Sequence, residues 1–215
     1  MKKYKAVIFD LDGTLLYTLE DLTDADNYVM RKFGYPEHTI DEVRSFVGNG
    51  IKLLIERSIP DGNKNPDFEA AFSEFKSYYT DHCQIKTRPY DGIMELLLKL
   101  YELGYKLAIV SNKNQAAVTE LNDIYFKDFI STAIGEMEGV RKMPAPDTVL
   151  KALSELGVTA DDAVYVGDSD VDRETAKNSG MNCVSVTWGF RDRELLESLN
   201  PYAIIDTPKD LLKYI

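Results

Sequence analysis

Short apolar runs separated by helical patterns dominate the chain after about residue 87. Runs that are short and rich in β-branched residues are typical of strands buried on both faces of a parallel sheet. They occupy residues 6–9, 106–110, 163–166 and 183–186, with weaker examples at 129–134 and 203–205. Most of them end in Asp, Ser, Gly or Thr, so the sequence predicts polar groups at the carboxyl ends of these strands.

Helical patterns fill the intervals between the predicted strands. Apolar residues recur every three or four positions over residues 93–103, 148–156 and 171–179, and a glycine closes each pattern. Glycine just after such a pattern is a common helix stop. The alternation of strand and helix predicts a doubly wound (Rossmann-like) parallel sheet of the α/β class.

Residues 16–86 interrupt this alternation, because they contain no convincing strand. Helices are predicted instead at residues 19–33, 51–59 and 68–83. The third of these is rich in aromatic residues on one face, which indicates core packing of a small helical unit rather than a cofactor site. We therefore expect an α/β core formed by residues 1–15 and 87–215, with an inserted α-helical cap domain at residues 16–86.

Composition and charge limit the partners of the chain. It has 215 residues, with 25 basic and 36 acidic side chains, for a net charge of −11. Such a surface repels nucleic acid and anionic membranes, and any phosphate chemistry needs a local positive site.

The apolar stretch behind the basic N-terminus is too short for a signal peptide or a membrane span, so we expect a cytoplasmic protein. Cys83 and Cys183 are expected to be free thiols.

Candidate chemistry gathers at the predicted strand ends. Asp10 and Asp12 follow the first strand, Ser111-Asn112-Lys113 follows another, and Asp168 follows a third. Functional groups in parallel sheets collect at the carboxyl edge, so Asp168 would meet Asp10 and Asp12 if their strands are neighbours. Hard carboxylate oxygens of this kind suit Mg²⁺. The alternative is that these aspartates form turns and helix caps.

Three stretches together resemble the signatures of one hydrolase superfamily. Asp10-Leu11-Asp12-Gly13-Thr14-Leu15 is similar to the first signature of the haloacid dehalogenase-like (HAD) hydrolases. Ser111 resembles the second signature, a hydroxyl at the end of an apolar strand, and Gly167-Asp168-Ser169-x-x-Asp172 resembles the fourth. The helical insertion after the first strand resembles the helical cap of that family. The matching signatures occur in the family's order and at its spacing over essentially the whole chain.

The resemblance implies a mechanism that the chemistry supports. Asp10 would attack phosphorus and form an aspartyl-phosphate, while Asp12 would protonate the leaving oxygen and then activate water. Mg²⁺ would be held by Asp10, the main-chain carbonyl of Asp12, and Asp168. Ser111, with neighbouring groups that include Asn112, would bind phosphoryl oxygens. The expected partner is a small phosphorylated metabolite.

The third signature of the family is a Lys directly before Pro-x-Pro, and this chain departs from it. Pro144-Ala145-Pro146 is present, but Met143 precedes it and Lys142 lies one position earlier. We favour Lys142 as the catalytic cation. Arg141 or Lys113 could substitute, or the site could be weakened, because carboxylates and a phosphate without an ammonium have raised pKa values.

Three further features each have two interpretations. In a functional role, Asp172 would order the groups around the metal ligands or hold a Lys; in a structural role, it simply favours the start of a helix. Gly48 and Gly50 resemble the Gly-x-Gly loop of phosphoglycolate phosphatases, which could place N–H groups over a small anion, or they form a plain helix-entry turn. Trp188-Gly189-Phe190-Arg191 resembles the same branch, or its aromatic residues pack the sheet edge.

The favoured function is a Mg²⁺-dependent phosphatase that hydrolyses small phosphomonoesters such as phosphoglycolate. Thr14 favours hydrolysis, because the phosphoglucomutase branch often has Val there. A β-phosphoglucomutase-type phosphotransferase using the same Asp10 and Asp12 is one alternative. A catalytically weakened binding protein of the same fold, suggested by Met143, is another. A dehalogenase is disfavoured, because that branch lacks the second aspartate and needs no metal.

Overall fold

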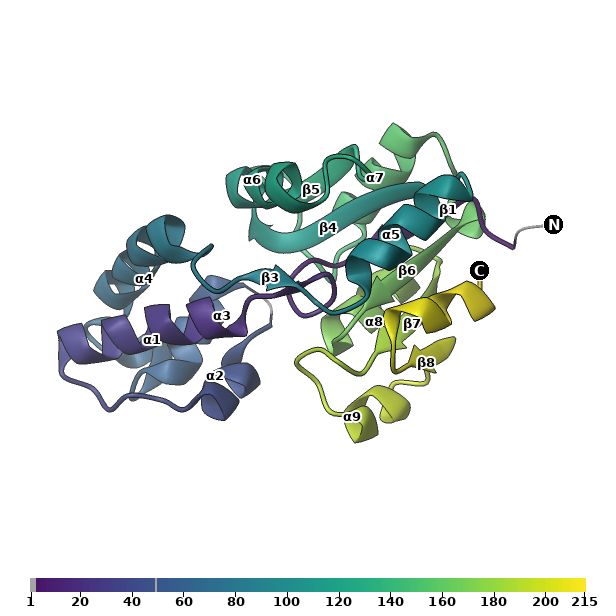
Figure 1. Cartoon of the computed structure of the whole chain (residues 1–215). Coiled ribbons are helices and arrows are strands. Elements are labelled where there is room, and N and C mark those ends of the chain that lie inside the picture. The colour runs from purple at the N-terminus through teal and green to yellow at the C-terminus, as the bar shows by residue number, and fades with distance from the viewer. Residues whose placement is uncertain (1–2, 49) are drawn as a thin grey trace. The chain divides into compact units, whose positions relative to one another are not determined.

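The computed structural model describes residues 3–48 and 50–215, and Figure 1 traces their path from the N-terminus to the C-terminus. The chain divides into two compact units. Unit 1 comprises Met1–Leu16 with Pro89–Ile215, and unit 2 comprises Tyr17–Arg88. Each unit has a hydrophobic core of its own.

Unit 1 is built on a six-stranded sheet in the order β5-β4-β1-β6-β7-β8, with every neighbouring pair parallel. The strands are β1 (Ala6–Phe9), β4 (Lys106–Asn114), β5 (Thr132–Glu136), β6 (Ala163–Gly167), β7 (Asn182–Val186) and β8 (Ala203–Ile205). All six predicted strands are present. β1 is central, and all four of its residues are buried, as a strand covered on both faces requires.

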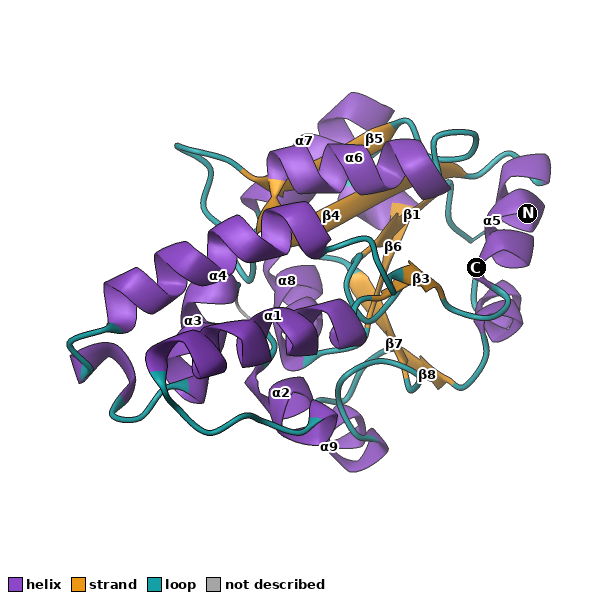
Figure 2. Cartoon of the chain, turned by 60° about the vertical axis from the view of Figure 1, so that its left-hand side comes forward, coloured by secondary structure: helices purple, strands orange, loops and turns teal. Residues whose placement is uncertain are grey.

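Helices cover both faces of this sheet, which is visible in Figure 2 as helical layers on either side of the strands. α5 (Ile93–Glu102) and α6 (Gln115–Tyr125) pack with Val7 and Phe9 of β1. α7 (Asp147–Leu156) and α8 (Asp170–Asn178) pack with the alternate residues of β1, Ala6 and Ile8. A shorter helix, α9 (Arg193–Ser198), and the 3₁₀ helices η2 (Ala160–Asp162) and η3 (Pro208–Lys213) complete unit 1. The predicted doubly wound fold class is confirmed.

The strand β4 is longer than its apolar run. The sequence pattern ends it at residue 110, but the strand continues through four polar residues to Asn114. Its pairing with β5 shifts register between Val110 and Asn114, where Asn114 meets Glu136. The residues expected beyond the strand are therefore held on the strand itself, which fixes their direction more firmly than a loop would.

Unit 2 is helical. It contains α1 (Leu19–Phe33), α2 (Ile40–Phe46), α3 (Ile51–Ser58), η1 (Gly62–Lys64) and α4 (Phe68–His82). Phe68, Phe75 and Tyr79 of α4 are buried in its core. This confirms that the aromatic pattern serves packing. α2 was not predicted, although Thr39 and Glu42 form a capping box at its start.

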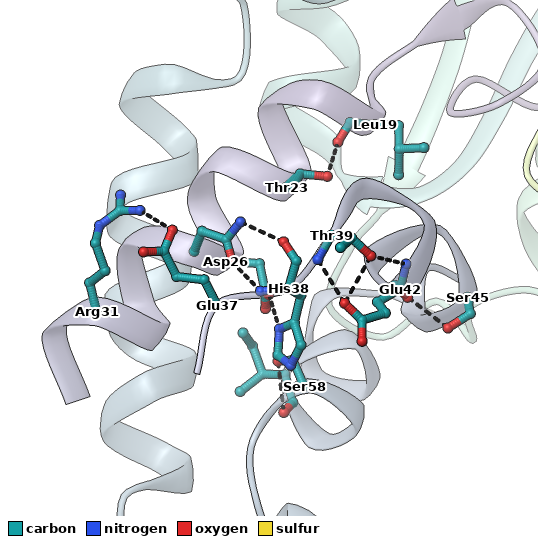
Figure 3. Close-up of polar contacts among 12 residues, drawn as sticks. Leu19, Thr23, Asp26, Arg31, Glu37, His38, Thr39, Glu42, Ser45 and Ser58 are labelled. Carbon is teal, nitrogen blue, oxygen red and sulfur yellow. Dashed lines mark hydrogen bonds and ion pairs between the residues drawn. The ribbon is translucent and has the colours of Figure 1, made fainter. Parts of the chain in front are cut away.

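The connection from α1 to α2 is held by polar contacts, drawn in Figure 3. His38 Nδ1 lies 2.7 Å from the buried carboxylate of Asp26. The main-chain N–H of His38 donates to the side chain of Asn27 at 2.7 Å, and the Asn27 amide donates to the His38 carbonyl at 2.8 Å. Burial raises the pKa of Asp26, and hydrogen bonds from His38 and Ser58 oppose this. The connection is therefore anchored to α1 by three separate contacts.

The two ends of unit 2 lie next to each other. β2 (Leu16–Tyr17) and β3 (Arg88–Pro89) pair as a two-stranded sheet where the chain passes between the units. The Arg88 guanidinium carbon lies 4.6 Å from the centre of the Tyr17 ring. The buried Asp21 carboxylate accepts the main-chain N–H groups of Lys86 and Thr87, the latter at 2.8 Å. These contacts tie the beginning of α1 to the segment after α4.

Two general expectations can be compared with the structure directly. In the part of the chain that the structure describes, Cys83 and Cys183 form no disulfide, as predicted; both are buried, and burial raises the pKa of the Cys183 thiol to about 12. Among the described residues, every helix is too short or too polar to cross a membrane.

Candidate functional site

The edge at which β1 ends brings Asp10 beside Asp168. β1 pairs with β4 on one side and with β6 on the other. The main-chain N–H of Asp10 donates to the carbonyl of Val166 in β6 at 2.9 Å. Because both strands are parallel and in register, the residues that follow them emerge together. The expected adjacency of these two strands is confirmed.

A tight turn follows Asp10 and carries Asp12. The N–H of Gly13 donates to the carbonyl of Leu16 at 2.9 Å, and the N–H of Leu16 donates to the carbonyl of Leu11 at 2.9 Å. Gly13 has a φ of 91°, and a Cβ there would lie 2.6 Å from the Asp168 Oδ2 atom. Glycine is therefore required both by the backbone conformation and by the approach of the turn to Asp168.

Three buried carboxylates converge at this edge. Asp10, Asp168 and Asp172 each offer an oxygen, and these oxygens all lie within 4.8 Å of one another. The three residues are 7%, 1% and 2% exposed, so water screens their mutual repulsion poorly. Oxygen ligands at this spacing fit a hard divalent cation.

The pKa values show the electrostatic cost of this cluster. Burial first, and then the charges of Asp172, Asp168 and Asp12, raise the pKa of Asp10 well above its usual range. Burial and the charge of Asp172 raise the pKa of Asp168 to about 7. A divalent cation among these oxygens would offset both effects. The donor set therefore fits Mg²⁺ in both chemistry and charge.

Asp172 belongs to α8 and is fully engaged by neighbouring donors. Its Oδ2 atom accepts the main-chain N–H groups of Asp168 and Ser169, at 3.1 and 2.9 Å, and the Ser169 hydroxyl at 2.6 Å. Its Oδ1 atom accepts the Tyr165 hydroxyl at 3.0 Å. Ser169 and Asp172 form the capping box of α8. Asp172 thus caps the helix and also faces the two other carboxylates.

Lys113, on the polar extension of β4, contacts the turn that follows Asp10. Its Nζ atom lies 3.0 Å from Asp12 Oδ1 and 3.3 Å from Oδ2. The Lys113 side chain is 6% exposed, and that of Asp12 is 20% exposed. An ion pair this well shielded interacts far more strongly than a surface pair.

Ser111 and Asn112 lie on the same extension. Ser111 is buried, and its hydroxyl oxygen accepts the main-chain N–H of Lys113 at 3.1 Å. The Asn112 amide donates to the main-chain carbonyl of Met143 at 2.9 Å. Asn112 therefore holds the loop that contains Met143 against β4.

The loop of the third signature buries Met143 and leaves Lys142 exposed. The Met143 sulfur lies 3.3 Å from the Tyr165 hydroxyl, the same hydroxyl that donates to Asp172. Arg141 pairs with Asp147 at 2.9 Å. The structure thus brings Lys113, and not Arg141, to the acidic turn by a direct contact.

Asp168 has two further partners that the sequence did not reveal. The main-chain N–H of Phe190 donates to its Oδ2 atom at 2.6 Å, and the Thr14 hydroxyl donates to Oδ1 at 3.3 Å. Both contacts join segments far apart in sequence. The residue types in the segment after β7, Trp188-Gly189-Phe190-Arg191, do not indicate that a main-chain N–H there contacts Asp168.

The predicted substrate loop belongs to unit 2. Gly48 has a φ of 121°, and Gly50, with a φ of 92°, is the N-cap of α3. Asn49 lies outside the described residues. Positive φ at both glycines explains why these positions carry no side chain.

Comparison with known proteins identifies relatives over most of the chain. The sequence profile of the haloacid dehalogenase-like hydrolase family matches residues 7–186. A phosphoglycolate phosphatase of Aquifex aeolicus is 31% identical over 210 residues, which cover 97% of this chain and 95% of the relative. A phosphoglycolate phosphatase of Neisseria meningitidis is 35% identical, covering 89% of this chain and 84% of its own. A crystal structure of a Lactobacillus delbrueckii protein superposes with a TM-score of 0.93 at 38% identity, covering 98% and 97% of the two chains.

Proposed function

This chain belongs to the haloacid dehalogenase-like hydrolases and is a phosphoric monoester hydrolase, and we propose that it acts through an aspartyl-phosphate on Asp10 with Mg²⁺ bound beside it. The observation that carries the proposal is the convergence of Asp10 with two other buried carboxylates within 4.8 Å. Buried acidic groups with strongly raised pKa values are characteristic of functional sites.

Asp10, Asp168 and the main-chain carbonyl of Asp12 would hold the metal. When bound, Mg²⁺ supplies positive charge that offsets the carboxylates and the incoming phosphate. Asp172 would orient the groups around the metal rather than bind the metal itself, because its oxygens already accept four hydrogen bonds. The buried Tyr165 hydroxyl and the Ser169 cap fix its orientation.

The reaction has two steps on Asp10. A carboxylate oxygen of Asp10 attacks phosphorus as the bond from phosphorus to the leaving oxygen breaks, and the Asp12 carboxyl gives that oxygen its proton. Asp12 then takes a proton from a water that attacks phosphorus. The bond between phosphorus and Asp10 breaks, which releases inorganic phosphate, restores the Asp10 carboxylate and leaves Asp12 protonated, as at the start of the cycle.

Ser111 and Lys113 would bind the phosphoryl oxygens. The Ser111 oxygen already accepts the N–H of Lys113, which leaves its own hydroxyl hydrogen available to a phosphate. Lys113 supplies the ammonium that the family places before Pro-x-Pro, because it contacts Asp12 directly. Lys142, favoured from the sequence, remains the competing candidate. The variants Lys113→Ala and Lys142→Ala distinguish these two candidates.

The relatives named phosphoglycolate phosphatase support a small anionic phosphomonoester as substrate, of which phosphoglycolate is the first to test. Gly48 and Gly50 would contribute main-chain N–H groups from the cap, because a residue without a side chain lets the backbone approach a small anion closely. The cap role of unit 2 is part of the same proposal.

Phosphate release from phosphoglycolate and from p-nitrophenyl phosphate tests the function. We expect turnover with Mg²⁺ and its loss on chelation. Asp10→Asn should reduce kcat by at least about a thousandfold, or about 4 kcal/mol. Asp161→Asn is the control, because Asp161 is exposed and precedes the amino end of β6, whereas Asp168 follows its carboxyl end; it should retain wild-type activity.

Three outcomes would redirect the proposal. Turnover that requires a sugar bisphosphate activator would identify a phosphotransferase that uses the same Asp10 and Asp12. Absence of Mg²⁺-dependent turnover on every phosphomonoester tried, with Mg²⁺ still bound, would identify a binding protein. Activity retained in Asp10→Asn would remove Asp10 as the nucleophile.

A further inference from the structure

We propose that the segment Trp188-Gly189-Phe190-Arg191, just after β7, is a positioning element that holds Asp168 and the turn after Asp10 ready for the metal. The proposal rests on the metal site proposed above and deepens it. It concerns a run of residues that take no part in the two reaction steps. The segment belongs to unit 1, as do both of its targets.

Contacts to Asp168 are the first support. The main-chain N–H of Phe190 donates to Oδ2 at 2.6 Å, and the Thr14 hydroxyl donates to Oδ1 at 3.3 Å. Asp168 is 1% exposed, so these protein donors replace the water that would otherwise orient its carboxylate. The segment after β7 therefore holds Oδ2 of Asp168, and the turn after Asp10 holds Oδ1. Donors of this kind around a metal ligand fix its direction and typically contribute a factor of ten or more to metal affinity.

Gly189 lies so close to Asp168 that no side chain fits between them. A Cβ on Gly189 would lie 2.2 Å from the Asp168 Cβ and 2.4 Å from Oδ2. The φ of Gly189 is not among the positive values in the described chain, so alanine is excluded by contact and not by backbone conformation. A glycine here lets the main chain reach the carboxylate.

Trp188 connects the same segment to the catalytic turn. Its indole N–H donates to the main-chain carbonyl of Thr14 at 3.0 Å. Thr14 lies two residues beyond Asp12 and is fully buried. A Thr14 residue that accepts from Trp188 and donates to Asp168 links all three groups. The turn and the carboxylate are thus fixed relative to each other through one short segment.

Arg191 anchors the far end of the segment. Its Nε atom lies 3.2 Å from the Asp170 carboxylate, at the first position of α8. The Arg191 side chain is 14% exposed. Trp188 also packs against the apolar core of unit 1, but packing alone requires neither the N–H of Phe190 at Asp168 nor the indole at Thr14.

Mg²⁺ binding measured by calorimetry tests the proposal. Trp188→Phe keeps a ring but removes the indole N–H, and we expect it to weaken Mg²⁺ binding by about tenfold. Gly189→Ala should weaken it at least as much, because the new Cβ displaces Asp168. Phe129→Leu, an aromatic-to-aliphatic change at a residue that packs against the same core cluster as Trp188, is the control, expected to bind Mg²⁺ within about twofold of wild type.

Thermal unfolding of the metal-free variants separates positioning from a purely structural role. The proposal is overturned if Trp188→Phe and Gly189→Ala bind Mg²⁺ like wild type, whether or not they unfold at lower temperature. Absence of Mg²⁺ binding in the wild-type protein would instead overturn the proposed metal site, and this inference with it. The two failures are thereby distinguished.

Fluorescence gives an independent readout, because Trp188 is the one tryptophan of the chain. Mg²⁺ should change its emission with the same affinity that calorimetry gives, since the indole is linked through Thr14 to Asp168. Asp168→Asn should abolish this change. Emission that stays constant while calorimetry shows saturation would contradict the link between Trp188 and the metal ligands.

Discussion

The ammonium of Lys113 lies 3.0 Å from the carboxylate of Asp12. This contact joins the polar extension of β4 to the turn after β1, two segments that are neighbours because their strands pair. It places a shielded positive charge at the edge of a cluster of four acidic residues, Asp10, Asp12, Asp168 and Asp172. The chain thus has a cation at this edge although Met143 stands where the family places its lysine.

Substitution of Lys113 tests whether this charge is used. We expect Lys113→Ala to lower kcat/KM at least tenfold, or about 1.4 kcal/mol, because the phosphoryl group loses its ammonium partner. Lys142→Ala, measured in the same steady-state assay, tests the candidate favoured from the sequence. A loss confined to Lys142→Ala would assign the role to that residue and leave Lys113 as a structural partner of Asp12.

Met143→Lys asks whether an ammonium at the usual position can still serve this site. The Met143 sulfur lies 3.3 Å from the Tyr165 hydroxyl, which in turn donates to Asp172. An ammonium at position 143 would face the acidic cluster. We therefore expect the double variant Lys113→Ala/Met143→Lys to have a kcat/KM about tenfold higher than that of Lys113→Ala alone. Met143→Leu, similar in volume and uncharged, should restore none. Equal activity of the two double variants would contradict the expectation.

The metal-free protein should lose stability as the pH rises. Burial and the charge of Asp172 raise the pKa of Asp168 from 3.8 to about 7, and Asp10 is shifted in the same direction. A carboxyl with a raised pKa binds more protons in the folded state than in the unfolded state between these values, so stability falls as the pH rises through that window.

Urea unfolding in chelator at pH 5, 6, 7 and 8, followed by Trp188 emission, measures this dependence in unit 1. Asp168→Asn should flatten the pH profile, because an amide does not titrate. Stability that increases from pH 5 to pH 7 in the wild-type protein would be the opposite of the expected sign. Mg²⁺ should reduce the loss at the higher pH values, since it competes with protons for the same oxygens.

Asp21 should be a major contributor to the stability of unit 2. Its carboxylate is 2% exposed and accepts the N–H groups of Lys86 and Thr87. Asp21→Ala would leave these donors unsatisfied, at a cost of about 2–3 kcal/mol in urea unfolding. Asp24→Ala is the matched control, because its ion pair with Lys86 is exposed and should contribute less than about 1 kcal/mol.

Much of the fold follows from local patterns. Each strand of the sheet contains a short apolar run, and β-branched residues distinguish these runs from helices. The pattern could not place the end of β4, because polar residues after Val110 read as a loop whereas they continue the strand beside β5. α2 was missed although Thr39 and Glu42 carry a readable capping signal.

The site was predictable to the extent that its residues lie in recognisable motifs. Asp10 and Asp168 could be brought together because each directly follows a parallel strand. The burial of Lys113 against Asp12 depends on strand order, which residue types alone do not specify. The contact from the Phe190 N–H to Asp168 uses the main chain, so no side-chain pattern could have indicated it.

The adjacency of Tyr17 and Arg88, at the two ends of unit 2, has a consequence for how the protein can evolve. An insert whose ends meet can enter a host gene at a single point, without breaking any strand of the host sheet. Lineages could exchange, lengthen or shorten the helical insert there while inheriting the carboxylates unchanged. Such a junction allows the helical insert to change separately from the sheet that carries the carboxylates.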